Sequence, residues 1–191
     1  MKGPVEALQF VDQIDKSSPV RPLLCSVLSL LALVFSHSAR ASDHYCPDFL
    51  IAPDTPAPSH RGELTFSPYT IHWSNNPEHK NVVLVALDEQ LPGGRLCGIS
   101  LFSNSFGQPS TYVYAGRQFN RLFGQPNLFL KVTAGIMYGY VGQYQNKVPL
   151  NYRGFSPAII PSLGYKLTEH DSVQIKLLGT AGLMFSWGRQ F

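Results

Sequence analysis

The stretch "SVQIKLLGTAGLMFSWGRQF", Ser172 to Phe191, holds two alternating segments on either side of a Gly-Thr-Ala-Gly turn. In the first segment the apolar side chains fall at every second position, at Val173, Ile175 and Leu177. In the second, Leu183, Phe185, Trp187 and Phe191 share one parity. A period of two is the signature of a strand with one apolar face and one polar face. This end of the chain therefore predicts a sheet that has one side in apolar surroundings.

The same texture extends back to residue 63, where runs rich in Val, Ile, Leu, Phe, Tyr and Thr alternate with Gly, Asn and Pro. No stretch of it sustains a helical period. The predicted strands are 63–74, 81–89, 95–106, 110–119, 127–140, 155–166, 172–179 and 182–191. We therefore predict an all-β, eight-stranded antiparallel transmembrane β-barrel, an up-and-down meander that is apolar outside and polar inside.

The alternative is a soluble barrel of the lipocalin kind, because alternation alone does not say which face is inside. Charged residues make up 14% of the chain and aromatic residues 12%, which favours a membrane surface over water. A barrel of eight strands has a lumen filled by side chains or by one slender ligand. This size argues against an open solute pore.

An apolar segment near the start, "PLLCSVLSLLALVF", runs from Pro22 to Phe35, follows Arg21 and is closed by Ala39-Arg40-Ala41. This order predicts a secretory signal peptide over residues 1–41, cleaved after Ala41. The segment is shorter than the roughly 20 residues of a spanning helix, although an uncleaved anchor is the alternative. The prolines of residues 42–62 predict an irregular periplasmic lead-in, so the barrel is assigned to residues 63–191 in a bacterial outer membrane.

Charge and cysteines exclude several classes of site. The net charge is +3 at pH 7, which is no basic footprint for nucleic acid. Cys25 lies in the leader, while Cys46 and Cys97 remain, and a disulfide between them is as well supported as two free thiols. Neither cysteine has a neighbour at ligand spacing, so no metal site and no cofactor are expected.

The strand order makes a prediction about the rims. With the amino terminus in the periplasm, His72 near the end of the first strand shares the outer rim with Asn104 and Ser105 near the end of the third. The longest connection, "VGQYQNKVPLNYRG" at 141–154, falls on the same side, as long loops do in these barrels.

Several motifs, in this order, resemble the lipid A palmitoyltransferases of Gram-negative outer membranes, from about Phe66 to Phe191. "YTIHWS" around His72 is similar to that family's Tyr-Thr-Tyr-His stretch, and "FSNS" to its Phe-Lys-Asp-Ser. "VTAGI" at 132–136 resembles Phe-Thr-Ala-Gly-Val, and "SPAIIPSLGY" at 156–165 repeats two prolines four apart before Gly-Tyr. The resemblance implies an eight-stranded barrel that moves a palmitoyl chain from a phospholipid to lipid A.

The resemblance also implies roles for residues. His72 is expected to be the general base, Ser105 the nucleophile or a hydroxyl that positions the ester, and Asn104 an oxyanion donor. Gly116 falls at the floor of the family's acyl pocket. Pro157 and Pro161 fall where that family has gaps in the hydrogen-bond ladder of its strands, through which lipid enters the barrel laterally from the membrane. Phe191 is expected to present the barrel to its assembly machinery, and the protein is expected to be a monomer.

Two departures from the family keep other functions open. Asn104 stands where the family has aspartate, and an amide cannot ionise, so Glu78 is a candidate stand-in. The prolines of 42–62 also exclude the family's amphipathic N-terminal helix. "HWSN" resembles the His-x-Ser-Asn motif of outer-membrane lipid A deacylases, which would make Ser74 the nucleophile. A barrel without catalysis, which binds lipid or passes a small solute, is the third interpretation; in it Asn104 and Ser105 form a turn.

Overall fold

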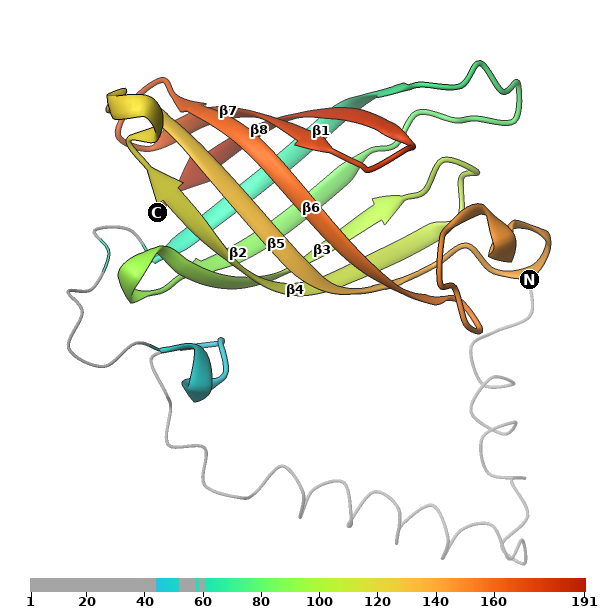
Figure 1. The fold of residues 1–191 in the computed structure, drawn as a ribbon, viewed down its shortest axis with the longest axis horizontal. Coiled ribbons are helices and arrows are strands. Elements are labelled where there is room, and N and C mark those ends of the chain that lie inside the picture. The colour runs from blue at the N-terminus through green and yellow to red at the C-terminus, as the bar shows by residue number, and fades with distance from the viewer. Residues whose placement is uncertain (1–43, 52–57, 59–60) are drawn as a thin grey trace, which may run out of the picture. The chain divides into compact units, whose positions relative to one another are not determined.

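The computed structural model describes residues 44–51, 58 and 61–191, whose main feature is a closed barrel of eight antiparallel strands (Figure 1). Each strand pairs with the next along the chain and the last pairs with the first. The strands are β1 (Gly62–His72), β2 (Leu84–Gln90), β3 (Arg95–Ser103), β4 (Pro109–Asn120), β5 (Leu128–Tyr138), β6 (Phe155–Lys166), β7 (Asp171–Leu177) and β8 (Gly182–Gln190). The predicted fold class and strand order are confirmed.

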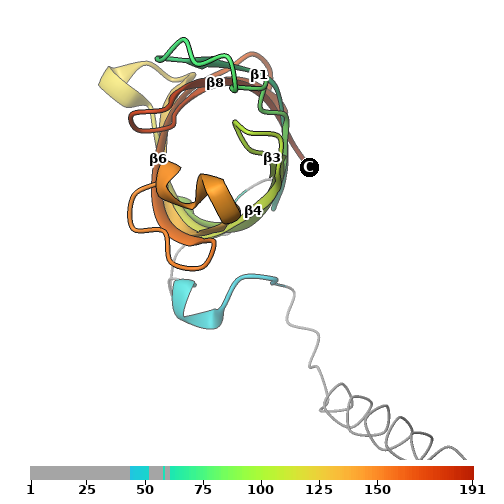
Figure 2. The same cartoon turned by 90° about the vertical axis from the view of Figure 1, so that its right-hand side faces the viewer.

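The connections divide the barrel into two different ends. The long-loop rim carries loops 73–83, 104–108, 139–154 and 178–181, and a short 3-10 helix, η4 (Gly142–Lys147), lies in the third of them. Figure 2 shows the barrel from this end, with η4 over its rim. The short-turn rim carries the turns 91–94, 121–127 and 167–170, with η2 (Pro92–Gly94) and η3 (Leu122–Gly124). The predicted strands 63–74, 81–89 and 95–106 run too far into the long-loop rim, because sequence alternation continues past the last ladder bond.

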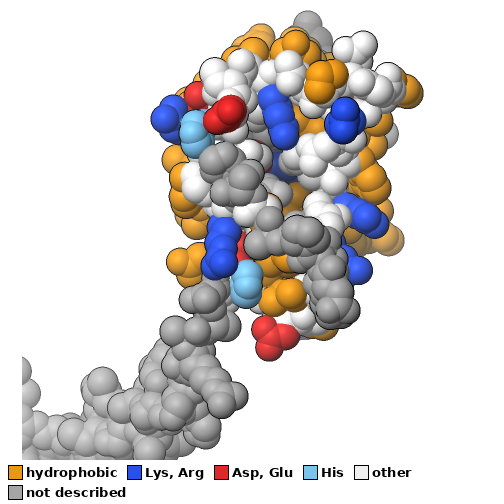
Figure 3. Space-filling view, turned by 90° about the vertical axis from the view of Figure 1, so that its left-hand side faces the viewer, with side chains coloured by type: hydrophobic (Ala, Val, Ile, Leu, Met, Phe, Trp, Pro, Cys, Tyr) orange, Lys and Arg blue, Asp and Glu red, His pale blue; other side chains and the backbone are white. Residues whose placement is uncertain are grey.

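The barrel is polar inside and apolar outside. Buried polar side chains project inward from the strands and include Thr65, Ser67, Ser100, Thr133, Ser162, Gln174 and Ser186. Large apolar side chains are exposed on the outer surface, among them Leu64, Val85, Leu101, Val113, Ile136, Ile159 and Ile175. Viewed from the short-turn rim, hydrophobic side chains gather around the circumference (Figure 3). This is the distribution of a transmembrane barrel and the reverse of a soluble one.

A buried ion cluster fills the half of the lumen near the short-turn rim. The Lys131 ammonium bonds with Glu63 at 2.8 Å and with Asp88 at 2.9 Å, and all three side chains are almost fully buried. Tyr114 donates its hydroxyl to Asp88, and Gln174 donates to Glu63 at 2.7 Å. Every charge therefore has opposite charge or hydrogen-bond partners, as a buried group requires. The side chains of the cluster fill the lumen at this level of the barrel.

Two groups of buried apolar side chains share the lumen with the ion cluster. One group of buried side chains comprises Val82, Leu84, Ala86 and Met184, with Phe102 and Leu178 packed against it. The other comprises Leu96, Tyr112 and Tyr114, with Met137, Ala158 and Ile160 beside it. Members of both groups and of the ion cluster line a cavity of about 30 Å³. That volume suits a single water molecule, so side chains fill the lumen.

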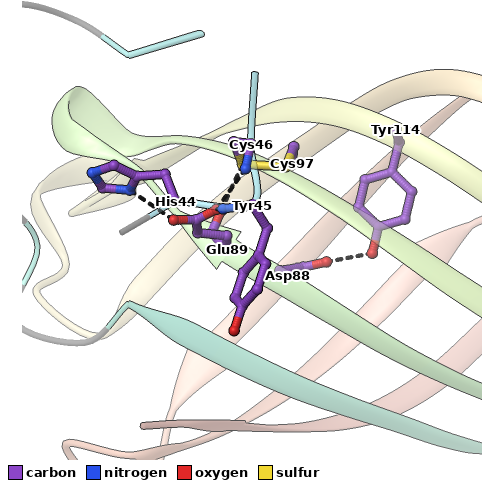
Figure 4. Close-up of a disulfide and its surroundings, with 7 residues drawn as sticks. All are labelled: His44, Tyr45, Cys46, Asp88, Glu89, Cys97 and Tyr114. Atoms are coloured by element: carbon purple, nitrogen blue, oxygen red, sulfur yellow. Dashed lines mark hydrogen bonds and ion pairs between the residues drawn. A yellow bond between two sulfur atoms is a disulfide. The ribbon is translucent and has the colours of Figure 1, made fainter. Parts of the chain in front are cut away.

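The described part of the lead-in is fastened to the short-turn rim. A disulfide joins Cys46 to Cys97 in β3, with a Cα–Cα distance of 5.6 Å. The Glu89 carboxylate accepts from the backbone N–H groups of Tyr45 and Cys46 and bonds with His44 at 2.7 Å (Figure 4). The pairing of the cysteines, which the sequence left open, is thus formed.

The structure describes only part of the predicted lead-in, so that prediction stays a prediction. Apart from the one-turn helix η1 (Asp48–Leu50), the described residues 44–51 are irregular. No helix in the described ranges is long and apolar enough to cross a membrane. The predicted signal peptide, with its cleavage site after Ala41, lies outside the described residues.

Candidate active site

His72 is the last residue of β1, and a bulge in that strand turns its ring into the barrel. The β1–β8 register shifts between Phe66 and Tyr69, where Ser67 and Pro68 together take the place of one strand position. Inward-facing residues are odd-numbered before the bulge, as at Glu63, and even-numbered after it, as at Thr70. Without the bulge, a strict period of two would point His72 outward. A bulge of this kind re-aims a side chain at the rim of a barrel.

Ser105 lies directly opposite His72, in the tight loop 104–108 that joins β3 to β4. Its Oγ is 2.9 Å from His72 Nε2, a hydrogen bond between side chains 33 positions apart in the chain. Ser105 is buried, with 6% of its surface exposed. The structure therefore brings together the imidazole and the hydroxyl that the sequence predicted to share a rim. A hydroxyl bonded to a neutral imidazole is the arrangement that activates serine for nucleophilic attack.

Asn104 shapes the loop that carries Ser105. Its Oδ1 accepts hydrogen bonds from the backbone N–H groups of Phe106 and Gln108, both at 3.0 Å, and its Nδ2 donates to Gln108 Oε1 at 3.3 Å. The residue is fully buried. Both ends of the amide are thus engaged within the turn, the usual role of asparagine at the start of a loop. These contacts favour a turn-forming role, and the predicted role as an oxyanion donor stays a prediction.

A pair of variants separates the two roles of Asn104. If the site carries out the acyl transfer that the resemblance implies, we expect Asn104→Asp to keep a rate within about 10-fold of wild type, because a carboxylate accepts from the same two N–H groups. Asn104→Ala leaves both N–H groups without their acceptor, so the Ser105 loop shifts and activity falls on the order of 10²-fold. Initial rates with a labelled phospholipid check both values. Strong loss in Asn104→Asp would instead assign the Nδ2 donor to catalysis.

The other acidic and hydroxyl candidates do not contact His72. Ser74 and Glu78 are exposed in loop 73–83, and in the described part of the chain neither side chain has a hydrogen bond with the imidazole. Asp88 belongs to the lumen ion cluster and Glu89 bonds with residues 44–46 of the lead-in, both at the opposite end of the barrel. His72 therefore has a hydroxyl partner in the structure, without a carboxylate among the residues described.

The neighbouring loops enclose the Ser105 turn. The backbone N–H of Lys80 donates to Ser105 O at 2.8 Å, which fixes loop 73–83 on the turn. The Gln108 side chain exchanges two hydrogen bonds with the backbone of Val141, at 3.2 and 3.1 Å, which fixes loop 139–154. Phe106 is buried between these loops. The site is thus held by three loops whose relative positions are set by backbone hydrogen bonds.

Gly116 faces the lumen in β4, where the backbone of β5 comes close. A Cβ at this position would lie 2.4 Å from Val132 O and 3.0 Å from Thr133 Cγ2, so a larger residue would push β5 away. Gly116 pairs with the buried Leu96, in the part of β3 and β4 nearer the short-turn rim. Its position suits the floor of an acyl pocket, which stays a prediction. In this conformation an acyl chain would have to displace side chains that now fill the space.

Pro157 and Pro161 lie on an open edge of the sheet. The β6–β7 ladder covers Ser162 to Lys166 and stops there, while β6 continues to Phe155 with β5 as its partner. Both prolines thus lie in the part of β6 that has no β7 neighbour within the described ladder. Proline lacks the N–H that a second partner would need, which keeps this edge unpaired. This unpaired edge of β6 lies on the side of the long-loop rim.

Comparison with known proteins gives a likeness in fold. No family of known proteins matches the sequence, and no curated protein does. Among solved structures, the chain is similar to one titled "De novo design of transmembrane beta-barrels", with 11% sequence identity and a TM-score of 0.49, over 72% of this chain and 99% of that one. A likeness of this degree says nothing about chemistry, so function has to be argued from the site.

Two residues of the site escaped the sequence analysis. Pro68 forms the bulge that re-aims His72, and a proline inside an alternating strand was the available signal. The His79 ring contacts the His72 ring, with centroids 4.5 Å apart. No short-range pattern marks a loop histidine as the neighbour of a strand histidine, so this contact depends on the folded loop.

Proposed function

We propose that this protein is an outer-membrane acyltransferase that moves a fatty acyl chain from a phospholipid to lipid A, or to another hydroxyl acceptor, at the long-loop rim. The observation that carries the proposal is the hydrogen bond of 2.9 Å between His72 Nε2 and Ser105 Oγ. An activated hydroxyl at the rim of a membrane barrel, beside an open strand edge, suits a substrate that arrives from the lipid layer.

The chemistry follows from the dyad. His72 takes the proton of Ser105 as the Oγ attacks the ester carbonyl, and the bond from the carbonyl carbon to the glycerol oxygen breaks. The proton passes from His72 to that oxygen, which leaves as a lysophospholipid. The acceptor hydroxyl then attacks the acyl group on Ser105, with His72 again taking the proton, and Ser105 is regenerated.

Two features support a lipid as substrate. The edge of β6 at Pro157 and Pro161 offers lateral entry for an acyl chain from the membrane. Lys147 Nζ lies 5.7 Å from the centre of the Phe106 ring, and the Lys80 side chain lies against Gly107, so two ammonium groups flank the residues after Ser105. Ammonium groups at this place suit the phosphate of a lipid headgroup.

The test is mass spectrometry of lipid A and phospholipids from cells with and without the protein, in a host that lacks its own palmitoyltransferase. Transfer predicts a gain of one acyl chain on lipid A and the appearance of lysophospholipid. Loss of an acyl chain from lipid A would instead establish a deacylase. Unchanged lipids from a folded protein would overturn both enzymatic interpretations.

The interpretation as a barrel without catalysis is favoured by one observation, the filled lumen, which holds a cavity of about 30 Å³ beside the ion cluster. The same observation counts against passage of a solute. Binding of lipid without turnover is therefore the form of this alternative that the unchanged lipid profile would support.

A further inference from the structure

His72 requires an orienting group, and the described residues provide no carboxylate for it. In a serine-histidine site the ring has to be held in one orientation for Nε2 to meet the hydroxyl. The amide of Asn104 is engaged within its own turn. Orientation of His72 must therefore come from packing.

The packing partner is His79, from loop 73–83. The two imidazole rings lie with centroids 4.5 Å apart and planes inclined by 34°. His79 Nδ1 is buried and has no hydrogen-bond partner among the described residues. Contact between rings, rather than a hydrogen bond from Nδ1, therefore keeps this side chain where it is.

The backbone of loop 73–83 places His79 relative to both members of the dyad. The N–H of His79 donates to Asn76 O at 3.0 Å, which closes a turn before it. The next residue, Lys80, donates its N–H to Ser105 O at 2.8 Å. The segment that presents His79 to His72 is thus attached to Ser105 itself, so the ring and the hydroxyl are located by the same piece of chain.

Two further rings support His79 from the other side. Phe106 meets His79 edge to face, with centroids 5.5 Å apart, and Tyr144 of η4 stacks on Phe106 at 4.2 Å and 14°. Distances of 4.5 to 7 Å between centroids are typical of favourable ring pairs. We call His72, His79, Phe106 and Tyr144 the ring column. It connects β1 with three loops of the long-loop rim.

We propose that His79 is a positioning residue, which holds the His72 imidazole toward Ser105 by contact between the two rings and is itself supported by Phe106 and Tyr144. The proposal deepens the proposed function and rests on it for its kinetic consequence. The contact itself is independent of which acyl acceptor, if any, the protein uses.

The kinetic test compares His79→Ala with His79→Phe in the full protein in detergent micelles, using a labelled phospholipid. We expect His79→Ala to lower kcat on the order of 10²-fold, with KM nearly unchanged, because the dyad is misaligned while lipid contacts remain. His79→Phe restores most of kcat, since a flat ring is retained. As a control, Tyr152→Ala removes an exposed ring of loop 139–154 outside the ring column and keeps full activity.

The second measurement does not need activity. In the NMR spectrum, the carbon-bound ring protons of His72 should be displaced by the ring current of His79, and the displacement should be lost in His79→Leu and kept in His79→Phe. If the wild-type protein shows this displacement but has no acyltransferase activity, the proposed function is rejected while the contact between the His72 and His79 rings is confirmed. Unshifted His72 protons, full activity of His79→Ala, or equal loss in His79→Ala and His79→Phe would each overturn the positioning role.

Discussion

Replacing His72 or Ser105 by alanine is expected to lower acyl transfer by about 10³-fold, because either change removes the base or the hydroxyl that it activates. The two side chains share one hydrogen bond, so each is ineffective without the other. The double variant His72→Ala with Ser105→Ala should therefore be hardly slower than either single variant. Initial rates with labelled phospholipid in micelles give all three values.

Matched controls lie in the same loops. Ser74→Ala removes the nucleophile that the deacylase motif would use, and Glu78→Gln removes the candidate stand-in for the family's aspartate. Both side chains are exposed, and neither has a hydrogen bond with His72 among the described residues. We expect both variants to keep wild-type rates. A shift in gel mobility between heated and unheated samples verifies that each barrel is folded. An inactive Ser74→Ala beside an active Ser105→Ala would move the nucleophile to Ser74.

Lys131→Met is expected to lower the free energy of unfolding by about 3 to 5 kcal/mol, the usual cost of removing one partner from a buried ion pair. The variant leaves the carboxylates of Glu63 and Asp88 in the lumen without their cation. Methionine is similar in length to lysine, so the lost stability measures the removal of the charge rather than a change in side-chain volume. Urea titration in lipid vesicles, followed by tryptophan fluorescence, measures the difference.

Charge removal provides the control for Lys131. Adding Glu63→Gln and Asp88→Asn to Lys131→Met removes the charge of the two carboxylates that have lost their cation, and should recover part of the lost stability. Lys176 keeps its hydrogen bond from Nζ to Gln174 at 3.2 Å in this variant. Lys80→Met, at an exposed lysine of the long-loop rim, should change the stability by less than about 0.5 kcal/mol. A triple variant less stable than Lys131→Met would contradict the view that unpaired charge causes the loss.

Much of the barrel follows from local pattern. The predicted strand 155–166 coincides with β6, and the shared parity of Leu183, Phe185 and Trp187 matches the outer face of β8. Such patterns are readable because a strand between lipid and a polar lumen alternates along its own length. The position of His72 and Ser105 at one rim also followed, since strand order alone puts the ends of β1 and β3 there, whereas their hydrogen bond depends on the bulge in β1.

What escaped prediction depends on contacts between distant segments. The bulge at Ser67 and Pro68 changes the phase of β1, and its presence is visible through the register with β8. The disulfide depends on a contact between residues 44–51 and β3, whose cysteines are 51 positions apart in the sequence. The engagement of Asn104 within its turn and the contact of His79 with His72 depend on loop conformation, which no periodicity encodes.

The closure between β1 and β8 has a consequence for how the barrel forms. Gly62 and Phe191 exchange two backbone hydrogen bonds of 2.9 Å, and a Cβ at Gly62 would strike the Phe191 ring, so the first and last positions of the barrel fit closely together. Before this junction forms, β1 and β8 are both free edges, whose unpaired N–H and C=O groups are costly in hydrocarbon. Insertion into lipid is therefore cooperative. An open sheet of seven strands still has two unpaired edges and gains little stability in lipid, and pairing of the eighth strand with the first removes both edges together.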